Sequence, residues 1–556
     1  MSKEIKTPWQ RFIGMLQPDR KDIKQIFYYA IFAGLVALSL PLGIQAIINL
    51  IQGAQISSSW IILVVLVTLG VGFQGVLQLM QVRILENMQQ KIFTRTSFDF
   101  AYRFPKIKLS EFNDYYPPEL ANRFFDILTV QKGLSKLLID FPAAILQIIF
   151  GLILLSFYHA FFIIYGFLLL GLIYLVYKYT AQTGMNTSLK ESKSKYKVAN
   201  WIQELARSVL NFKISSKTNL ILRRNDSLTL EYINAREGHF KILMQQFAQM
   251  IVFKILVTAG LLVIGGLLVL NQKMNIGQFV AAEIIILLVI SSVEKLITGL
   301  ESFYDVLTSL EKIGQVFDKE VDPELGVDPF LNEQQISIEM DDVAYTAPNG
   351  KEIIKSASLK INAKDRILLK GPPGSGKSTL LKVISGLLPH TKGAIYLNDI
   401  SVRAVQLEDY RHAIGQVLPE QNPFHGSILE NITYGDPNIT PERLHWALKN
   451  LGLLDYVKEQ PNGINTMIKS EGLEVPHTIS KRIVLAAAII KKPKLLLIKD
   501  ALEEFDAEEA TKIIEFLIAP DKPWALVVAS RSARWNNKCN KLITLKDAVL
   551  TSSNVN

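Results

Sequence analysis

Long apolar segments fill the first half of the chain. A helix crosses a bilayer with about 20 apolar residues, and six segments before Leu310 reach or approach that length, the fourth being the shortest. Buried helices of a soluble protein are the alternative, but six such segments in succession predict a helical membrane domain with six transmembrane helices. We place them at Ile26 to Ile51, Trp60 to Met80, Ile139 to Tyr158, Phe161 to Tyr177, Phe247 to Leu270 and Ile276 to Leu300.

The connections between these segments alternate in length and charge. Those after the first, third and fifth segments are short, and Lys273 is their one basic residue. Met1 to Lys24, Gln81 to Lys136 and Lys178 to Met244 are rich in Lys and Arg. Because basic connections stay on the cytosolic side, we expect both termini and both long connections in the cytosol, and the segments in an inner or plasma membrane.

The long cytosolic connections predict paired helices that continue past the bilayer. The first pair is expected to turn at Ser110 to Asn122, which contains Pro117 and Pro118, and the second pair at Asn211 to Leu220. The ends of both pairs would then reach a cytosolic domain.

Charge and cysteine content narrow the classes of function. The net charge of +9 is compatible with nucleic-acid binding, but the basic residues lie mainly between the apolar segments, so membrane topology accounts for them and no nucleic-acid partner is expected. Cys539 is the only cysteine, which excludes an internal disulfide and a cysteine-based metal site.

A chain of 556 residues is too long for one core. A linker at 312–334, with Pro323 and Pro329, precedes strands and helices that alternate as in α/β domains. The predicted organisation is therefore a cytosolic segment at 1–25, a membrane domain with long cytosolic helix extensions at 26–311, the linker, and an α/β domain at 335–556.

The α/β domain contains a phosphate-binding motif of the form G-x-x-x-x-G-K-S. It follows a predicted strand, Arg366 to Lys370, and precedes a predicted helix, Leu380 to Leu388. Glycines let backbone N–H groups close around phosphates, the lysine reaches the outer phosphates, and the serine hydroxyl is suited to ligate Mg²⁺. The predicted nucleotide-binding residues of this loop are Gly371, Gly374, Ser375, Gly376, Lys377, Ser378 and Thr379, with Ser378 as the metal ligand.

The order of motifs resembles the nucleotide-binding domain of ABC transporters, which implies an α/β P-loop domain that binds ATP. Tyr345 falls where the family stacks an aromatic ring on adenine, although a strand tyrosine packed on the sheet is the alternative. Residues 414–432 look like the stretch around the Q-loop, and residues 482–506 look like the run from the signature helix to the D-loop.

The membrane half looks like that of ABC exporters, in which six helices carry long cytosolic extensions. Asn275 to Phe279, and the following helix down to Phe317, look most like the type I secretion branch, the haemolysin-type peptide and protein exporters. That branch often has an N-terminal peptidase-like domain, which we expect to be absent because the first apolar segment begins near Ile26.

Two motifs that the family uses for catalysis are altered. Counting back from Phe424, the Q-loop glutamine, which in the family contacts Mg²⁺ and the attacking water, falls on Pro419. Gln416 and Gln421 are near but out of register. The signature, which in the family caps the ATP of the opposite subunit, falls on 475–479 and loses both of its glycines.

The next strand and switch also depart from the family. The residues on either side of this strand set the register. Lys499 then stands where the family has the aspartate that holds Mg²⁺, and Asp500 stands where the family has the general base. A slip of one residue would make Asp500 the metal ligand and leave Ala501 as the base, so one part is missing in either register. Ser530 stands at the switch histidine.

These substitutions predict a weak ATPase or none, with ATP as the cofactor and Mg²⁺ left open, because phosphoryl transfer depends on positioning and charge neutralisation. An ammonium group at Lys499 would repel Mg²⁺ and partly neutralise phosphate itself, which predicts metal-independent binding. Compensating residues nearby are the alternative.

The resemblance implies an exporter half-transporter in contact with membrane lipid. It would form a homodimer, or a heterodimer with another ABC half-transporter, and move a peptide, protein or lipophilic solute outward, with a periplasmic adaptor protein as a further candidate partner. The second hypothesis is a catalytically silent, ATP-binding membrane scaffold or regulatory subunit of a secretion or transport assembly.

Overall fold

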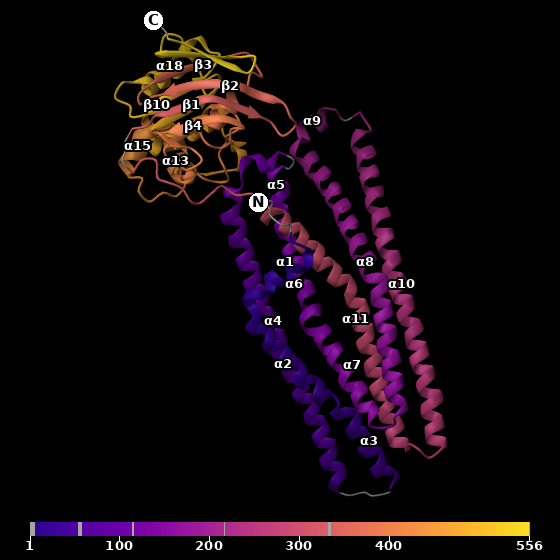
Figure 1. The fold of residues 1–556 in the computed structure, drawn as a ribbon. Coiled ribbons are helices and arrows are strands. Elements are labelled where there is room, and N and C mark those ends of the chain that lie inside the picture. The colour runs from indigo at the N-terminus through magenta and orange to yellow at the C-terminus, as the bar shows by residue number, and fades with distance from the viewer. Residues whose placement is uncertain (1–5, 54–57, 114–115, 216, 332–334, 555–556) are drawn as a thin grey trace. The chain divides into compact units, whose positions relative to one another are not determined.

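The computed structural model describes all residues except 1–5, 54–57, 114–115, 216, 332–334 and 555–556. The chain divides into two compact units (Figure 1). The first, Met1–Pro105 with Tyr115–Lys319, is helical, and the second, Lys106–Asp114 with Glu320–Asn556, is built around a sheet. The division after Lys319 falls inside the predicted linker.

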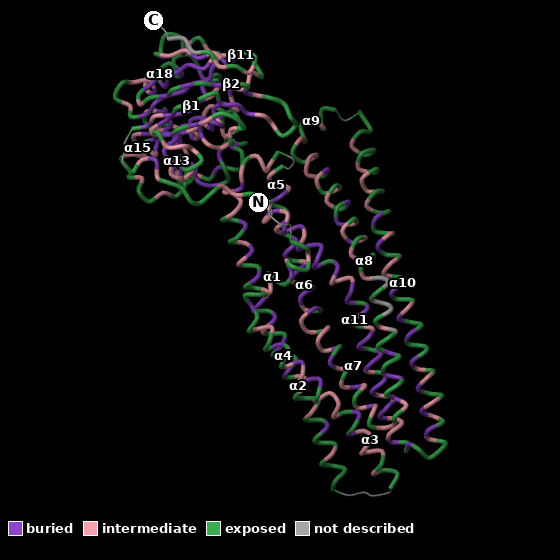
Figure 2. Tube along the Cα trace, in the orientation of Figure 1, coloured by how far each residue is buried: buried purple, intermediate pink, exposed green. Residues whose placement is uncertain are grey.

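The first unit is formed by long helices with short connections. Apolar side chains on α4 and α10 remain exposed along the predicted spans, among them Leu66, Leu69 and Leu262, and Figure 2 shows the exposed outer face of α10. The backbone N–H and C=O groups of a helix bond to one another, so a helix can turn an apolar face toward lipid. Exposed apolar faces of this kind are typical of lipid-facing surfaces. The helices are α1 (Pro8–Leu16), α2 (Arg20–Ala37), α3 (Ser39–Gln52), α4 (Ser58–Arg103), α5 (Pro117–Ala121), α6 (Asp126–Ser135), α7 (Phe141–Ser156), α8 (Phe161–Arg207), α9 (Val209–Ile214), α10 (Leu220–Leu270) and α11 (Ile276–Phe317).

Within the described residues, five stretches are long and apolar enough to cross a membrane. They contain the first, second, fifth and sixth predicted segments, and the third predicted segment up to Ser156. The fourth predicted segment lies at the start of α8, where the described residues include the apolar stretch Phe161–Gly171. The predicted linker begins at residue 312, but helix α11 continues to Phe317. The first residues of the predicted linker are therefore helical.

The start of α11 is fixed by its own sequence. The Asn275 side chain accepts a hydrogen bond from the Gln278 backbone N–H at 2.7 Å, and the Gln278 side chain accepts one from the Asn275 N–H at 3.0 Å. This reciprocal cap satisfies two N–H groups that a helix end otherwise leaves unpaired. The predicted turn at 211–220 is confirmed, because α9 ends at Ile214, α10 begins at Leu220, and α8 packs against α10.

A ten-stranded sheet organises the second unit, in the order β5-β4-β1-β2-β12-β11-β3-β10-β9-β6. Strands β11, β3, β10, β9 and β6 run parallel. The bounds are β1 (Ile338–Thr346), β2 (Glu352–Ile361), β3 (Arg366–Lys370), β4 (Lys392–Leu397), β5 (Ile400–Ser401), β6 (Ile414–Val417), β9 (Leu495–Lys499), β10 (Ala525–Ala529), β11 (Lys541–Lys546) and β12 (Val549–Asn554), with β7 (Gly426–Ser427) paired to β8 (Met467–Ile468) in a separate small sheet.

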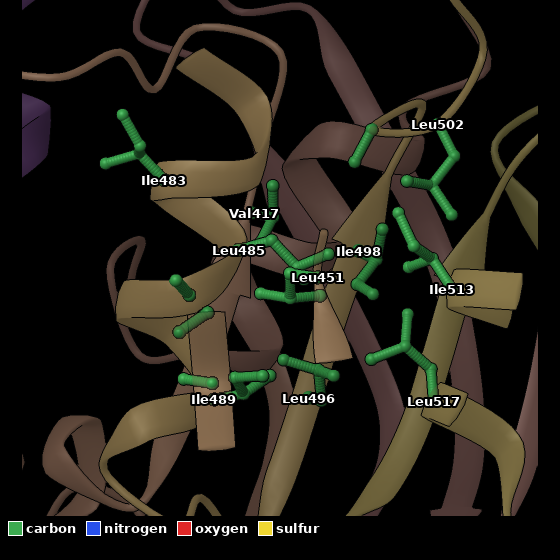
Figure 3. Close-up of a cluster of buried hydrophobic side chains, with 14 of the residues drawn as sticks. Val417, Leu451, Ile483, Leu485, Ile489, Leu496, Ile498, Leu502, Ile513 and Leu517 are labelled. Atoms are coloured by element: carbon green, nitrogen blue, oxygen red, sulfur yellow. The ribbon is translucent and has the colours of Figure 1, made fainter. Parts of the chain in front are cut away.

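Helices cover the sheet and bury its apolar strands. In Figure 3, Val417 of β6 and Leu496 and Ile498 of β9 meet side chains of α17 and α18, such as Leu485 and Leu517. Burial of these side chains supplies the main favourable free energy for this layer. The helices are α12 (Lys377–Ile384), α13 (Leu407–His412), α14 (Ile428–Thr433), α15 (Pro441–Asn450), α16 (Leu454–Glu459), α17 (His477–Ile490) and α18 (Ala507–Ile518).

The segment Lys106–Asp114 belongs to the second unit, although the sequence placed it in the membrane domain. Ile107 pairs with Val321 in an isolated antiparallel bridge, and the Lys108 N–H donates to the Glu320 carbonyl at 2.9 Å. These contacts join residues more than two hundred positions apart, which a local sequence pattern does not reveal.

Candidate nucleotide site

Four parallel strands bring the predicted site residues to one edge of the sheet. β10 lies between β3 and β9, and β6 lies beside β9. In the register, Ala529 lies opposite Leu369 on one side and Lys499 on the other. The loops that follow these strands therefore meet at their carboxyl ends, which is where open α/β sheets bind ligands.

The loop after β3 has the glycines that its backbone requires. A Cβ on Gly371 would lie 2.4 Å from the Leu545 carbonyl oxygen, and Gly374 and Gly376 have φ angles of 76° and 99°. Only glycine adopts such angles without strain. The predicted strand Arg366–Lys370 is confirmed residue for residue as β3. The predicted helix is real but begins earlier and ends earlier, at Lys377 and Ile384, so Ser378 and Thr379 lie in its first turn.

Lys377 folds back on its own loop. Its Nζ donates to the carbonyl oxygens of Gly371 at 2.7 Å and Pro372 at 2.9 Å, and its side chain is buried. Burial lowers the pKa of Lys377; the nearby Arg531 and Lys499 lower it further, while Asp500 raises it. Lys377, Arg531 and Lys499 thus place three positive charges at this loop, and the Asp500 carboxylate opposes them.

Lys499 is the last residue of β9, and Asp500 is the first residue beyond it. The Lys499 Nζ lies 3.5 Å from Asp500 Oδ2, and both side chains are mostly buried. The Asp500 backbone has φ 46° and its N–H donates to the Ala529 carbonyl at 3.0 Å. The carboxylate that the sequence assigned as a degenerate general base is therefore paired with the ammonium group beside it.

Ser530 lies directly after β10 and is buried. Its hydroxyl donates to Glu503 Oε1 at 2.5 Å and accepts from the Ser532 N–H at 3.0 Å. Glu503 is a site residue that the sequence analysis missed. The available signal was a pair of acidic residues, Glu503 and Glu504, placed shortly before Asp506.

Pro419 lies in the loop after β6, and this loop is held by its backbone. Lys481 of α17 donates to the carbonyl oxygens of Pro419 at 2.7 Å and Gln421 at 2.8 Å. The Gln421 side-chain oxygen accepts from the Leu418 N–H at 2.7 Å, so this amide is occupied within its own loop. Glu420, next to Pro419, pairs with Lys382 at 2.6 Å. Lys481 was also missed, since nothing in its local pattern points to this loop.

Residues 475–479 form the start of α17. Pro476 is the residue before the helix, and His477, its first residue, pairs through Nδ1 with Glu504 Oε2 at 2.7 Å. The positions at which the family has glycines thus carry His477 and Thr478.

Tyr345 lies on β1 opposite Ile354, and its side chain is 8% exposed within a core of buried apolar residues. Burial raises its pKa. A buried ring agrees with the alternative in which Tyr345 packs on the sheet. Stacking on adenine would require one face of the ring to lie outside this core.

The donor set fits a nucleotide better than it fits a divalent cation. The glycines, the helix start at Lys377 and the basic side chains around it suit phosphates. Within the described residues, no cluster of three His, Cys, Asp or Glu side chains forms a candidate metal site. The Ser378 hydroxyl remains as the predicted ligand, but an ammonium group at Lys499 does not fit Mg²⁺, which prefers carboxylate and water oxygens.

Two family profiles match the chain. Residues 25–293 match the family profile described as ABC transporter transmembrane region, and residues 354–503 match the profile described as ABC transporter.

Relatives and one solved structure extend the match over most of the chain. The alpha-hemolysin translocation ATP-binding protein HlyB of Escherichia coli O157:H7 is 26% identical over 66% of this chain and 49% of its own length. The mitochondrial iron-sulfur clusters transporter ABCB7 of Oryzias latipes is 30% identical over 36% of this chain and 26% of its own. Each of these matches spans less than half of the relative. The structure of a bacterial Atm1-family ABC exporter with ATP bound has the same fold, with a TM-score of 0.84 and 16% identity over 96% of this chain and 94% of that one.

Proposed function

The chain belongs to the ABC transporters, with a transmembrane region followed by a nucleotide-binding domain, and on that premise we propose that it is an exporter-type half-transporter that binds ATP but hydrolyses it weakly or not at all. ATP binds at the loop formed by Gly371 to Thr379.

The observation that carries this proposal is the Lys499–Asp500 pair at the end of β9. Phosphoryl transfer needs a metal that bridges the phosphates and a group that orients water. Here the strand end supplies an ammonium group, and the neighbouring carboxylate lies 3.5 Å from it. The Lys499 charge neutralises phosphate directly, while the paired Asp500 is a poor acceptor for the proton of an attacking water.

Two further departures from the family also lower the expected rate of ATP hydrolysis. The Ser530 hydroxyl is directed to Glu503 at 2.5 Å, so a neutral, short group bonded to a carboxylate stands at the switch position. Pro419 has no side-chain amide to position water at the metal site. Losing several groups that act as a unit removes most of the catalysis.

Assembly and transport follow from the same premise. The chain pairs with itself or with a related half-transporter in an inner or plasma membrane, with both termini in the cytosol. Its substrate is a peptide, a protein or a lipophilic solute. The similarity to HlyB supports the peptide and protein classes and a periplasmic adaptor as a further partner.

The test is ATP binding and hydrolysis by the full chain in lipid nanodiscs, with and without Mg²⁺. We expect saturable ATP binding in EDTA and turnover indistinguishable from that of Lys377→Ala. Turnover well above that variant would contradict weak catalysis. Binding that requires Mg²⁺ would contradict direct neutralisation by Lys499.

A second candidate function, an ATP-binding scaffold or regulatory subunit, is favoured by the start of α17. His477 Nδ1 lies 2.7 Å from a Glu504 carboxylate oxygen, so this helix end presents a His–Glu pair instead of glycine N–H groups to the ATP of a partner. Absence of turnover in every co-purified assembly, with ATP binding intact, would favour this function over transport.

A further inference from the structure

A cavity of about 270 Å³ lies in the second unit, and none of its lining residues belongs to the phosphate-binding loop. Its walls come from Lys108, from Asp322 and Pro323, from the end of α12 through His390, and from the stretch between Ile395 and Leu407. The segment that contains Lys108 is held there by the Ile107–Val321 bridge. The cavity is therefore closed by chain segments that are far apart in the sequence.

The lining is mainly apolar. Val383 and Ile395 are buried, Pro389 and Arg403 are exposed, and most of the other lining residues are partly exposed. The volume lies just below the roughly 300–1,000 Å³ that drug-sized ligands occupy, so the space suits a small molecule. The apolar lining residues are Val383, Leu387, Leu388, Ile395, Val402 and Leu407.

The ionisable groups at the cavity divide into two paired and two unpaired side chains. Lys108 pairs with Glu320 at 2.7 Å, and Asp322 pairs with Arg411. Over the part of the chain that the structure describes, Arg403 and His390 have no side-chain hydrogen bond or ion pair. Burial lowers the pKa of His390, and the Arg403 charge lowers it further. Arg403 thus acts on His390 while neither has an acidic partner.

A monoanion matches this pair of side chains. The guanidinium of Arg403 supplies one full positive charge and planar N–H donors that fit a carboxylate. A neutral His390 supplies one further N–H donor. The apolar walls exclude water from the rest of the ligand and favour a hydrocarbon body.

We propose that this cavity binds a small amphipathic carboxylate, with its apolar body against Leu387 and Val402 and its carboxylate at Arg403 and His390. The site is separate from the nucleotide site, and its existence does not depend on ATP hydrolysis or on the transported substrate.

The probe for the test is 2-naphthoate, titrated calorimetrically into the full chain in lipid nanodiscs, with empty nanodiscs subtracted. We expect one saturable site per chain. Acetate, which lacks the apolar body, and 2-naphthamide, which lacks the charge, are each expected to bind at least tenfold more weakly. Equal binding of the neutral amide, or no saturable binding above empty nanodiscs, would overturn the proposal.

Variants locate the site. Arg403→Gln should weaken 2-naphthoate binding by roughly tenfold or more, because a charge-assisted hydrogen bond is lost. Val402→Phe fills the cavity and should abolish binding. Lys351→Gln, an exposed change outside the lining, is the matched control and should bind as the parent does. Retained ATP binding by each variant establishes that it is folded, and unchanged 2-naphthoate affinity in folded Arg403→Gln would refute the assignment.

Discussion

The Nζ of Lys481 lies 2.7 Å from the carbonyl oxygen of Pro419, so the helix that begins at the signature position holds the loop at the Q-loop position. The same ammonium group donates to Gln421 O at 2.8 Å and lies 3.3 Å from Asn422 Oδ1. Its side chain is only 4% exposed. The two shorter bonds go to backbone oxygens, so they do not depend on which side chains the loop carries at Pro419 and Gln421.

Replacing Lys481 should loosen this loop. Lys481→Met keeps the length of the side chain but removes the donor to two partly buried carbonyl groups, and each lost hydrogen bond costs about 0.5–1.5 kcal/mol of unfolding free energy. We expect a lower thermal midpoint and faster proteolysis after Gln421. Lys512→Met, which removes an exposed lysine of α18 paired with Glu508, is the control and should change stability by less than about 0.5 kcal/mol. Equal effects of the two changes would argue against a specific role for Lys481.

Restoring an acidic residue at the end of β9 should change the metal dependence of nucleotide binding. Lys499→Asp replaces an ammonium group with a carboxylate, which at the proposed metal position is a suitable ligand for Mg²⁺. We expect ATP affinity to become Mg²⁺-dependent and to fall roughly tenfold or more in EDTA, because a charged partner of the phosphates is lost. Lys499→Met separates the two effects, since it should weaken binding in EDTA without introducing dependence on Mg²⁺. Parent-like affinity of both variants in EDTA would mean that Lys499 does not contact phosphate.

Replacing glycines of the phosphate loop with alanine should weaken ATP binding, whereas the same change at an unhindered glycine elsewhere should not. Gly371→Ala places a Cβ 2.4 Å from the Leu545 carbonyl, and Gly376→Ala forces alanine to a φ of 99°. Each should reduce ATP binding by tenfold or more, since the strain is of order 1–3 kcal/mol. In Gly14→Ala the added Cβ meets nothing within 4 Å, so this helix substitution should leave ATP binding unchanged. Isothermal titration with ATP distinguishes these outcomes.

Lys312, on the part of α11 beyond the membrane span, should make stability depend on pH. Burial, and the nearby charge of Arg123, lower its pKa from 10.5 to about 8, although Asp126 and Glu311 oppose the shift. Between these two values the unfolded chain binds more protons than the folded chain, so stability rises as pH increases from about 8 to 10.5.

The measurement for Lys312 is the difference in thermal midpoint between the parent and Lys312→Met at several pH values. Below pH 8 the lysine is charged in both states, so Lys312→Met should be the more stable protein there by a constant margin. The margin should shrink as pH rises toward 10. A margin that does not change over this range would show that Lys312 keeps an ordinary pKa in the folded protein.

The sequence predicted those parts of the fold that depend on local pattern. Strand β3, the glycine positions of the loop and the start of α11 at Asn275 follow from short-range steric and capping rules. The end of α12 did not follow, because the helix stops at Ile384, four positions before the predicted end at Leu388, and Gly386 then takes a φ of 67°.

Several of the predicted site residues lie at one edge of the sheet, but their contacts were not predicted. Strand order brings Lys499 and Ser530 to the same edge as Lys377, as the motif order had indicated. The partners of these residues, Glu503 for Ser530 and Lys481 for the Pro419 loop, come from other elements, and their bonds depend on tertiary packing that no local periodicity encodes. The burial of Tyr345 likewise depends on which face of β1 the core covers.

The Lys377 ammonium group donates to two backbone carbonyls of its own loop. When phosphate binds there, its oxygens replace these carbonyls as hydrogen-bond acceptors. The ammonium group gives up the oxygens of Gly371 and Pro372 and receives phosphate oxygens in their place. Its contribution to affinity is therefore the difference between two sets of hydrogen bonds. The Lys377 cation is satisfied by carbonyl groups of its own loop, so phosphate at this position competes with those carbonyls for the ammonium group.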